Sequence, residues 1–173
     1  MWLEVGDHLA IELAPCSTHP NVDLFAKSFV SRQKIRAETT GCHHAQFVVG
    51  WCHDFAFGVE KDLEISTKFY GLALDKKNAR AAQNLGSFFA QGQDHQQAFE
   101  MFSRAAEYGS ISALCEVGRF YEEGGVVTKD VARGVETYKQ CAEAGLPEAM
   151  CLYGICFRIG MGVEENFQKA FEW

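Results

Sequence analysis

The feature that most constrains this chain is an internal repeat. An apolar residue followed by glycine occurs four times: Val49-Gly50, Leu85-Gly86, Val117-Gly118 and Tyr153-Gly154. The four glycines are spaced by 36, 32 and 36 residues. Periods of this length are typical of proteins that stack copies of one supersecondary unit, because a single unit cannot bury its own apolar face. The repeat therefore predicts a solenoid whose core is continuous from one copy to the next.

The residues around each glycine predict a first helix in every copy. An alanine stands four residues before each apolar anchor: Ala45, Ala81, Ala113 and Ala149. A ring-bearing residue stands three residues after each glycine: His53, Phe89, Tyr121 and Phe157. Such positions share one helix face, and the glycine between them indicates that a second helix approaches closely.

A short polar residue predicts where the second helix of each copy begins. These residues are Asp62, Asp94, Asp130 and Asn166. A side chain of this kind caps a helix N-terminus and stabilises it by about 1 kcal/mol. Gly109 and Gly145 follow the second helices of two copies, where glycine readily takes the left-handed conformation that ends a helix. In the first copy Lys77 stands at this position instead.

This pattern of alanine, glycine, Gly-Val loop and capping aspartate resembles the Sel1-like repeat, a relative of the tetratricopeptide repeat. The resemblance is strongest in "YGICFRIGMGVEENFQKAFEW" and covers residues 45–173. It implies an all-α fold, an α/α solenoid of antiparallel helix pairs wound into a right-handed superhelix. We expect copies at 45–80, 81–112 and 113–148, and an incomplete copy at 149–173. The second copy departs from the pattern because it lacks the Gly-Val loop.

Residues 1–44 are expected to form an N-terminal segment that includes a degenerate half-repeat, a helix at about 23–40. Ala37 and Gly41 stand in this segment as Ala105 and Gly109 stand in a complete copy. Residues 1–20 fit either a strand or a helix, and the sequence does not decide between them. The last copy stops at Trp173. We interpret this ending as a piece of a longer array or as an end that associates with a second chain.

Composition excludes some classes of partner. The net charge is −7 and the sequence pI is about 5.3. Nucleic acids and anionic membranes are therefore not expected as partners, because phosphates are bound mainly by Lys and Arg. The start of the chain has no basic region typical of a secretory signal, and no apolar run is long enough to span a bilayer. The seven cysteines contain no CxxC pair, which favours reduced thiols in a cytoplasmic protein.

The resemblance also implies where a partner protein or peptide would bind, because first helices line the concave groove of tetratricopeptide-like stacks. The candidate contact residues at these positions are Phe47, Trp51, Phe55, Arg119, Ile155, Arg158 and Ile159. The first three form a stripe of large apolar groups that suits an apolar anchor of a peptide. The favoured alternative is that the N-terminal segment covers the stripe.

Arg119 and Arg158 together suggest a site for a carboxylate. Glu122 and Glu123 lie next to Arg119 in the sequence, and we expect them to neutralise it. A clamp for a peptide carboxylate is therefore not expected.

Metal binding, cofactors and catalysis find little support. The candidate ligands Cys42, His43, His44, Cys52 and His53 fall in one helix, where ten residues at 1.5 Å each separate Cys42 from Cys52 by about 15 Å. Ser31 and Lys34 have the spacing of a Ser-x-x-Lys nucleophile, but no accompanying motif is present. We expect no metal, no cofactor and no enzyme activity.

The sequence therefore predicts a protein-interaction scaffold or adaptor. Two alternatives stay open. One is a hydrolase that interacts with β-lactams, as suggested by cysteine-rich relatives of this repeat family. The other is the regulatory tail of a multidomain signalling or ubiquitin-ligase protein.

Overall fold

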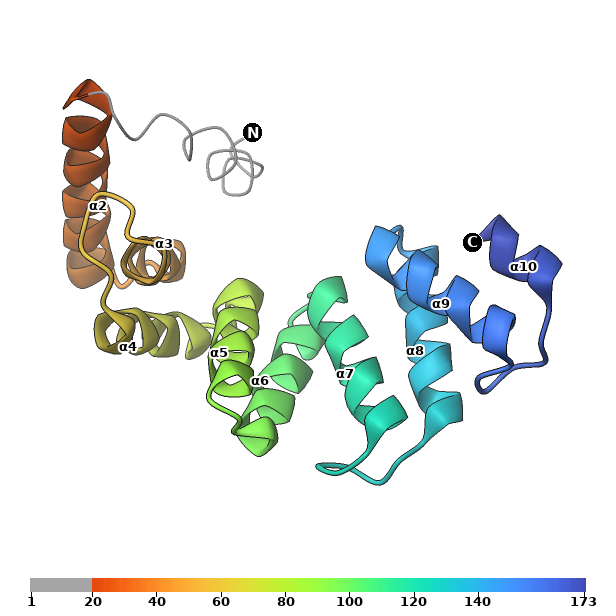
Figure 1. The fold of residues 1–173 in the computed structure, drawn as a ribbon. Coiled ribbons are helices and arrows are strands. Elements are labelled where there is room, and N and C mark those ends of the chain that lie inside the picture. The colour runs from red at the N-terminus through yellow and green to blue at the C-terminus, as the bar shows by residue number, and fades with distance from the viewer. Residues whose placement is uncertain (1–19) are drawn as a thin grey trace. The chain divides into compact units, whose positions relative to one another are not determined.

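The computed structural model describes residues 20–173. Residues 1–19, which make up nearly all of the segment whose fold the sequence left open, lie outside the described residues, and so does any cover that they form over the aromatic stripe. The described chain is all helical (Figure 1). The described residues divide into two compact units, here called the N-terminal unit (up to Ala73) and the C-terminal unit (Leu74–Trp173). None of the described helices is long and apolar enough to cross a membrane.

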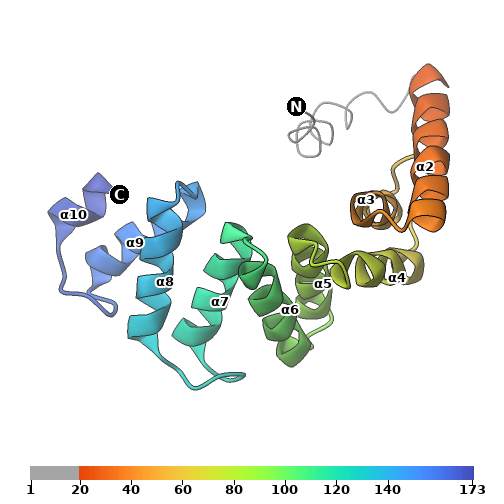
Figure 2. The ribbon, with the colours of Figure 1, turned by 180° about the vertical axis from the view of Figure 1, so that it is seen from behind.

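The C-terminal unit is an all-α stack in which each helix packs against the next one in the sequence (Figures 1 and 2). Its helices are α5 (Ala79–Gln91), α6 (His95–Glu107), α7 (Ile111–Glu123), α8 (Val131–Glu143), α9 (Pro147–Ile159) and α10 (Phe167–Glu172). Both predicted features of the fold class, helical composition and pairwise stacking, are confirmed. Successive hairpins share their cores: Ala113 and Val117 of α7 pack with Ala98, Phe102 and other residues of the preceding hairpin.

Close contact between a glycine and an aromatic ring joins the two helices of each complete copy. A Cβ added to the glycine would lie 2.7 Å from Cδ1 of Tyr70 at Gly50, 2.8 Å from Cδ1 of Phe102 at Gly86, and 3.0 Å from Cε1 of Tyr138 at Gly118. At Gly50 and Gly86 these distances are shorter than real Cβ contacts, and at Gly118 the contact is tighter than most, so each ring occupies the space that a side chain would need. This contact is the close helix approach that the repeated glycine predicts.

The loops between paired helices share two hydrogen bonds. Each predicted capping residue accepts a hydrogen bond from the backbone N–H three residues later: Ile65 to Asp62, Gln97 to Asp94, Arg133 to Asp130 and Lys169 to Asn166, at 2.9–3.1 Å. The backbone N–H of each capping residue also donates to a carbonyl in the first helix or at its end: Asp62 to His53, Asp94 to Phe89, Asp130 to Tyr121 and Asn166 to Phe157, at 2.8–3.0 Å. The caps are confirmed, and the second bond explains why loops of different length start the next helix at an equivalent place.

The N-terminal unit contains α2 (Pro20–Thr40), α3 (His43–Asp54) and α4 (Leu63–Leu74, whose last residue belongs to the other unit). α2 buries Ala26, Val30 and Ala37 on one side, and the loop after α3 presses on it: a Cβ at Gly58 would lie 2.5 Å from the Ala26 carbonyl carbon. Gly162 makes the equivalent approach to Val131 and Val135 of α8. α2 therefore packs against α3 as the second helix of a preceding repeat would.

The glycine–ring contact gives a matched pair of substitutions in the N-terminal unit. We expect Gly50→Ala to lower the free energy of unfolding by about 1–3 kcal/mol, because the added methyl overpacks the Tyr70 ring and the Ser66 carbonyl. A Cβ added at Gly71 on α4 would meet no atom within 4 Å. Gly71→Ala should therefore raise stability by up to about 1 kcal/mol, because alanine has a higher helix propensity than glycine. Urea denaturation measures both. Equal effects of the two substitutions would contradict the contact.

Lys77 offers a second test, because it takes the left-handed conformation (φ +58°) that Gly109 and Gly145 take in later copies. A residue with a Cβ pays about 1–2 kcal/mol in this conformation. We expect Lys77→Gly to stabilise the protein by about 1 kcal/mol, seen as a higher urea midpoint. Lys76→Gly is the control: Lys76 is exposed and outside the left-handed region, so this change should be neutral or destabilising. A fall in the midpoint of Lys77→Gly would refute the assignment.

Candidate functional site

A groove of about 540 Å³ opens on the C-terminal unit, lined by residues of α5, α6, α7 and α9. This volume lies within the range of about 300–1,000 Å³ in which proteins bind small molecules and side chains. Phe102 and Phe120 supply aromatic lining, and their rings contact each other at 6.3 Å between centroids. Ser87 of α5 contributes an exposed hydroxyl. The groove therefore combines an apolar portion with polar groups.

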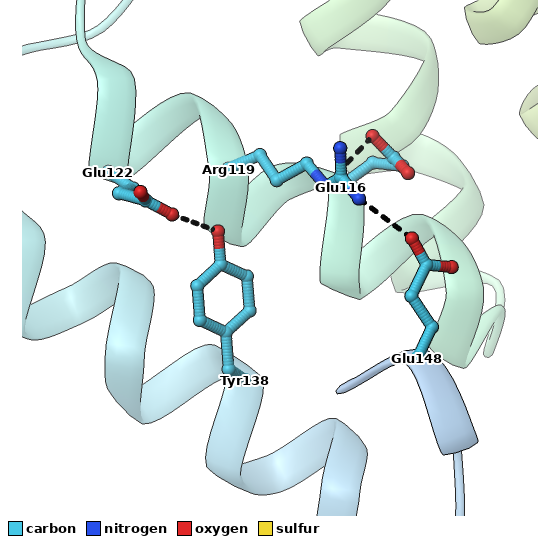
Figure 3. A network of polar contacts seen from close by, with 5 residues as sticks. All are labelled: Glu116, Arg119, Glu122, Tyr138 and Glu148. Carbon is cyan, nitrogen blue, oxygen red and sulfur yellow. Dashed lines mark hydrogen bonds and ion pairs between the residues drawn. The ribbon is translucent and has the colours of Figure 1, made fainter. Parts of the chain in front are cut away.

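Arg119 on α7 lines the polar side of the groove, and Figure 3 shows its contacts with Glu116 and Glu148. Its Nη2 donates a hydrogen bond of 2.7 Å to Oε1 of Glu148, at the start of α9, and its Nε lies 3.9 Å from Oε2 of Glu116. The Arg119 and Glu148 side chains are both partly exposed, so solvent weakens the pair, and such pairs contribute at most about 1 kcal/mol. The main effect is geometric, because this bond connects the first helices of two successive copies.

A carboxylate on α7 also ties it to α8. The Tyr138 hydroxyl donates a 2.5 Å hydrogen bond to Oε2 of Glu122 (Figure 3), and burial together with this bond raises the pKa of Tyr138. Tyr70 donates to Asp54 at 3.3 Å in the equivalent positions of the first copy. Glu122 is therefore part of the joint between paired helices.

These contacts change the electrostatic picture that the sequence suggested. The sequence predicted that Glu122 and Glu123 neutralise Arg119. In the structure Arg119 pairs with Glu116 and Glu148, and Glu122 accepts a hydrogen bond from Tyr138. Glu116 lies one helical turn before Arg119, three residues earlier on α7, and Glu148 reaches Arg119 from the next repeat. Arg158 is exposed on α9 and is not among the groove-lining residues, so the two arginines do not form a joint carboxylate site.

The predicted stripe of Phe47, Trp51 and Phe55 lies in the N-terminal unit, where the structure splits it. Phe47 stacks on Tyr70, with ring centroids 5.8 Å apart, and belongs to the joint between α3 and α4. Trp51 stacks on Phe55 at 5.3 Å and contacts Phe57 at 5.8 Å. Phe55 is 63% exposed, whereas Trp51 is half-buried. Trp51 is thus held by packing on two sides, and whether the stripe binds a partner stays a prediction.

Ile155 and Ile159 on α9 are 37% and 57% exposed, and neither is among the groove-lining residues. Phe167 and Phe171 on α10 are also exposed, but Trp173 packs against Tyr153 at 5.2 Å between ring centroids. End-to-end self-association through this last copy stays a prediction.

Comparison with known proteins identifies the repeat. The family model described as "Sel1 repeat" matches residues 43–78, 79–110, 111–146 and 147–173. The chain belongs to the Sel1 repeat family. Each matched repeat begins two residues before the start expected from the alanine anchors. A search of curated proteins found no match.

The chain resembles solved structures of Sel1 repeat proteins. A Sel1 repeat protein from Oxalobacter formigenes is 31% identical with a TM-score of 0.79, and the match covers 86% of this chain and 62% of that one. The protein c5321, a protective antigen present in uropathogenic Escherichia coli strains that displays an SLR fold, is 25% identical with a TM-score of 0.74. That match covers 82% of this chain and 31% of c5321. The chain thus spans less than two thirds of either structure.

The groove residues that sequence reasoning missed are Glu116 and Glu148. Glu148 stands one residue before the alanine anchor of the fourth Sel1 repeat, and Ser112, at the same position of the third repeat, also lines the groove. The sequence therefore held a signal for Glu148, because equivalent positions of two neighbouring repeats line one groove. Glu116 stands three residues after Ala113, at a position that holds Val48, Asn84 and Leu152 in the other copies. The alignment of copies gave no reason to select it.

The other candidate residues, the metal ligands around α3 and the Ser31–Lys34 pair on α2, are not brought together into a site. α3 is continuous from His43 to Asp54, so nine helical residues separate Cys42 from Cys52. The described residues hold no group of three or more metal-ligating side chains. The Ser31 hydroxyl donates a 2.9 Å hydrogen bond to the Lys27 carbonyl of its own helix, and Ser31 and Lys34 are both exposed on α2.

Cys52, Cys115, Cys141 and Cys156 of the Sel1 repeats are buried in the cores, whereas Cys151 is exposed. Burial raises the pKa of Cys52 and Cys115 to about 12 and that of Cys156 to about 11. Unfolded thiols titrate near 8.5. As the pH rises above this value the unfolded state loses protons first, so stability that is complete at pH 7 is lost progressively toward pH 11–12.

We therefore expect the free energy of unfolding to fall steeply between pH 8 and 10, by roughly 2 kcal/mol for each buried thiol. Urea midpoints at several pH values measure it. Cys52→Ala should be less stable at pH 7 but lose less stability on raising the pH, while Cys151→Ala, at an exposed thiol, should keep the wild-type profile. An unchanged profile in Cys52→Ala would contradict the assignment.

Proposed function

We propose that the chain is a protein-interaction scaffold that holds a segment of a partner protein in the groove of the C-terminal unit. The groove itself carries this proposal, because it presents aromatic and charged side chains together on helices from successive repeats. Sel1 repeats generally mediate protein interactions, which supports the same class of function. Rigid helices are well suited to hold such contact residues in fixed positions.

The proposal includes no catalytic step, no cofactor and no binding to nucleic acid or membrane. It keeps the expected cytoplasmic setting, in which the thiols remain reduced. The β-lactam-interacting hydrolase is not favoured, because the exposed Ser31 hydroxyl donates to a backbone carbonyl of its own helix. A scaffold could also be the regulatory part of a larger signalling or ubiquitin-ligase protein. That alternative concerns the protein in which the scaffold stands and leaves the proposed binding role unchanged.

Filling the groove with a bulky side chain tests the proposal directly. Peptides selected from an unbiased display library on the wild-type protein should bind Ser87→Trp at least tenfold more weakly, because the indole occupies the groove. Gln140→Trp, an exposed position on α8 of the same unit, is the matched control and should bind as the wild type does. Fluorescence anisotropy measures the affinities. Selected peptides that bind both variants equally would refute the groove as the binding surface.

A further inference from the structure

Resting on the proposed function, we infer that the groove of the C-terminal unit recognises a basic segment, an extended peptide that places a Lys or Arg side chain among Glu116, Glu123 and Glu148. Sequence reasoning weighed the opposite charge, a carboxylate held by Arg119. The structure supports the basic partner through three features: the balance of charge, the occupied state of the arginine and the aromatic lining.

The balance of charge is negative. Among the described residues that line the groove, Arg119 is the one Lys or Arg side chain, against three glutamates. Arg119 is already bound to Glu148 at 2.7 Å and lies 3.9 Å from Glu116. A peptide carboxylate that approached the guanidinium would meet the negative charge of both glutamates. A cationic side chain meets carboxylates that outnumber the arginine, so charge complementarity favours it.

The surroundings of Glu116 add to this preference. It is half-buried, and burial raises the pKa of its carboxyl, while Arg119 acts in the opposite direction. A partly desolvated carboxylate with one distant ion-pair partner gains more from a second cation than a fully solvated one does. Glu123 is exposed at the end of α7, where it extends the negative surface toward solvent.

The aromatic lining matches the rest of a long basic side chain. Phe120 is half-buried and lines the same groove as the three glutamates, and its ring contacts Phe102, which is almost fully buried. The methylene stem of Lys or Arg packs on apolar surface while its charged end remains among polar groups, and a guanidinium also stacks on aromatic rings. Neutral polar side chains would satisfy neither part of the groove as well.

Three nine-residue probe peptides of equal length test the inference: alternating Ala and Arg, alternating Ala and Glu, and alternating Ala and Gln. We expect the Arg peptide to bind most tightly at pH 8, with an affinity that falls as salt is added. Ser87→Trp should abolish the difference between this peptide and the other two.

Single charge changes then give effects of opposite sign. Glu123→Gln should weaken the Arg peptide about fivefold, whereas Arg119→Gln should tighten it by a similar factor, because it removes the competing cation. Glu143→Gln makes the same charge change as Glu123→Gln at an exposed site on α8 outside the groove lining, and should change the affinity less than twofold. Urea denaturation establishes that each variant is folded.

The outcomes separate this inference from the proposed function. Tighter binding of the Glu peptide, weaker binding of the Arg peptide by Arg119→Gln, or equal effects of Glu123→Gln and Glu143→Gln would overturn the basic partner. Failure of the Arg peptide to bind at low salt would do the same. The groove would remain the binding surface if library-selected peptides still depended on Ser87, and it would be lost as well if they did not.

Discussion

The close approach of a glycine to an aromatic ring is the contact on which the rest of the structure depends. At Gly50, Gly86 and Gly118 the ring of the second helix occupies the space where a Cβ would stand. This fixes the separation of paired helices, and the buried tyrosines can then reach carboxylates on the first helix in two copies. The third pair, Gly86 and Phe102, keeps the packing without a hydroxyl, so the glycine–ring contact is the part of the joint that the three complete copies share.

Once paired helices have a fixed separation, the contacts between repeats decide the properties of the exposed surface. Ser110, which caps α7, donates a 2.7 Å hydrogen bond to Gln83 of α5, and Arg119 of α7 reaches Glu148 of α9. These bonds run along the first helices of three successive copies. They leave the groove with more carboxylates than cations and with its arginine engaged, so that scaffold and charge preference both arise from the same row of helices.

Departures of single copies from the common pattern are local. The loop of the second copy is four residues shorter, yet its cap residue Asp94 makes the same backbone hydrogen bond as Asp130. Lys77 takes the left-handed conformation in place of glycine, because the chain must still turn there between α4 and α5. The fold tolerates these changes since each repeat depends on its neighbours for its core, not on any single loop.

The sequence by itself determined the helices, their caps and their pairwise stacking, because these depend on spacings of three and four residues and on a period that recurs. The caps of α5 and α7 by Asn78 and Ser110 follow the same local rules, although the repeat pattern did not single them out. Only the tertiary structure decided that Arg119 pairs with Glu148, 29 residues away, and that Trp51 packs against Phe57 in the following loop. Such contacts depend on the distance between neighbouring helices and on side-chain rotamers, which no local spacing encodes.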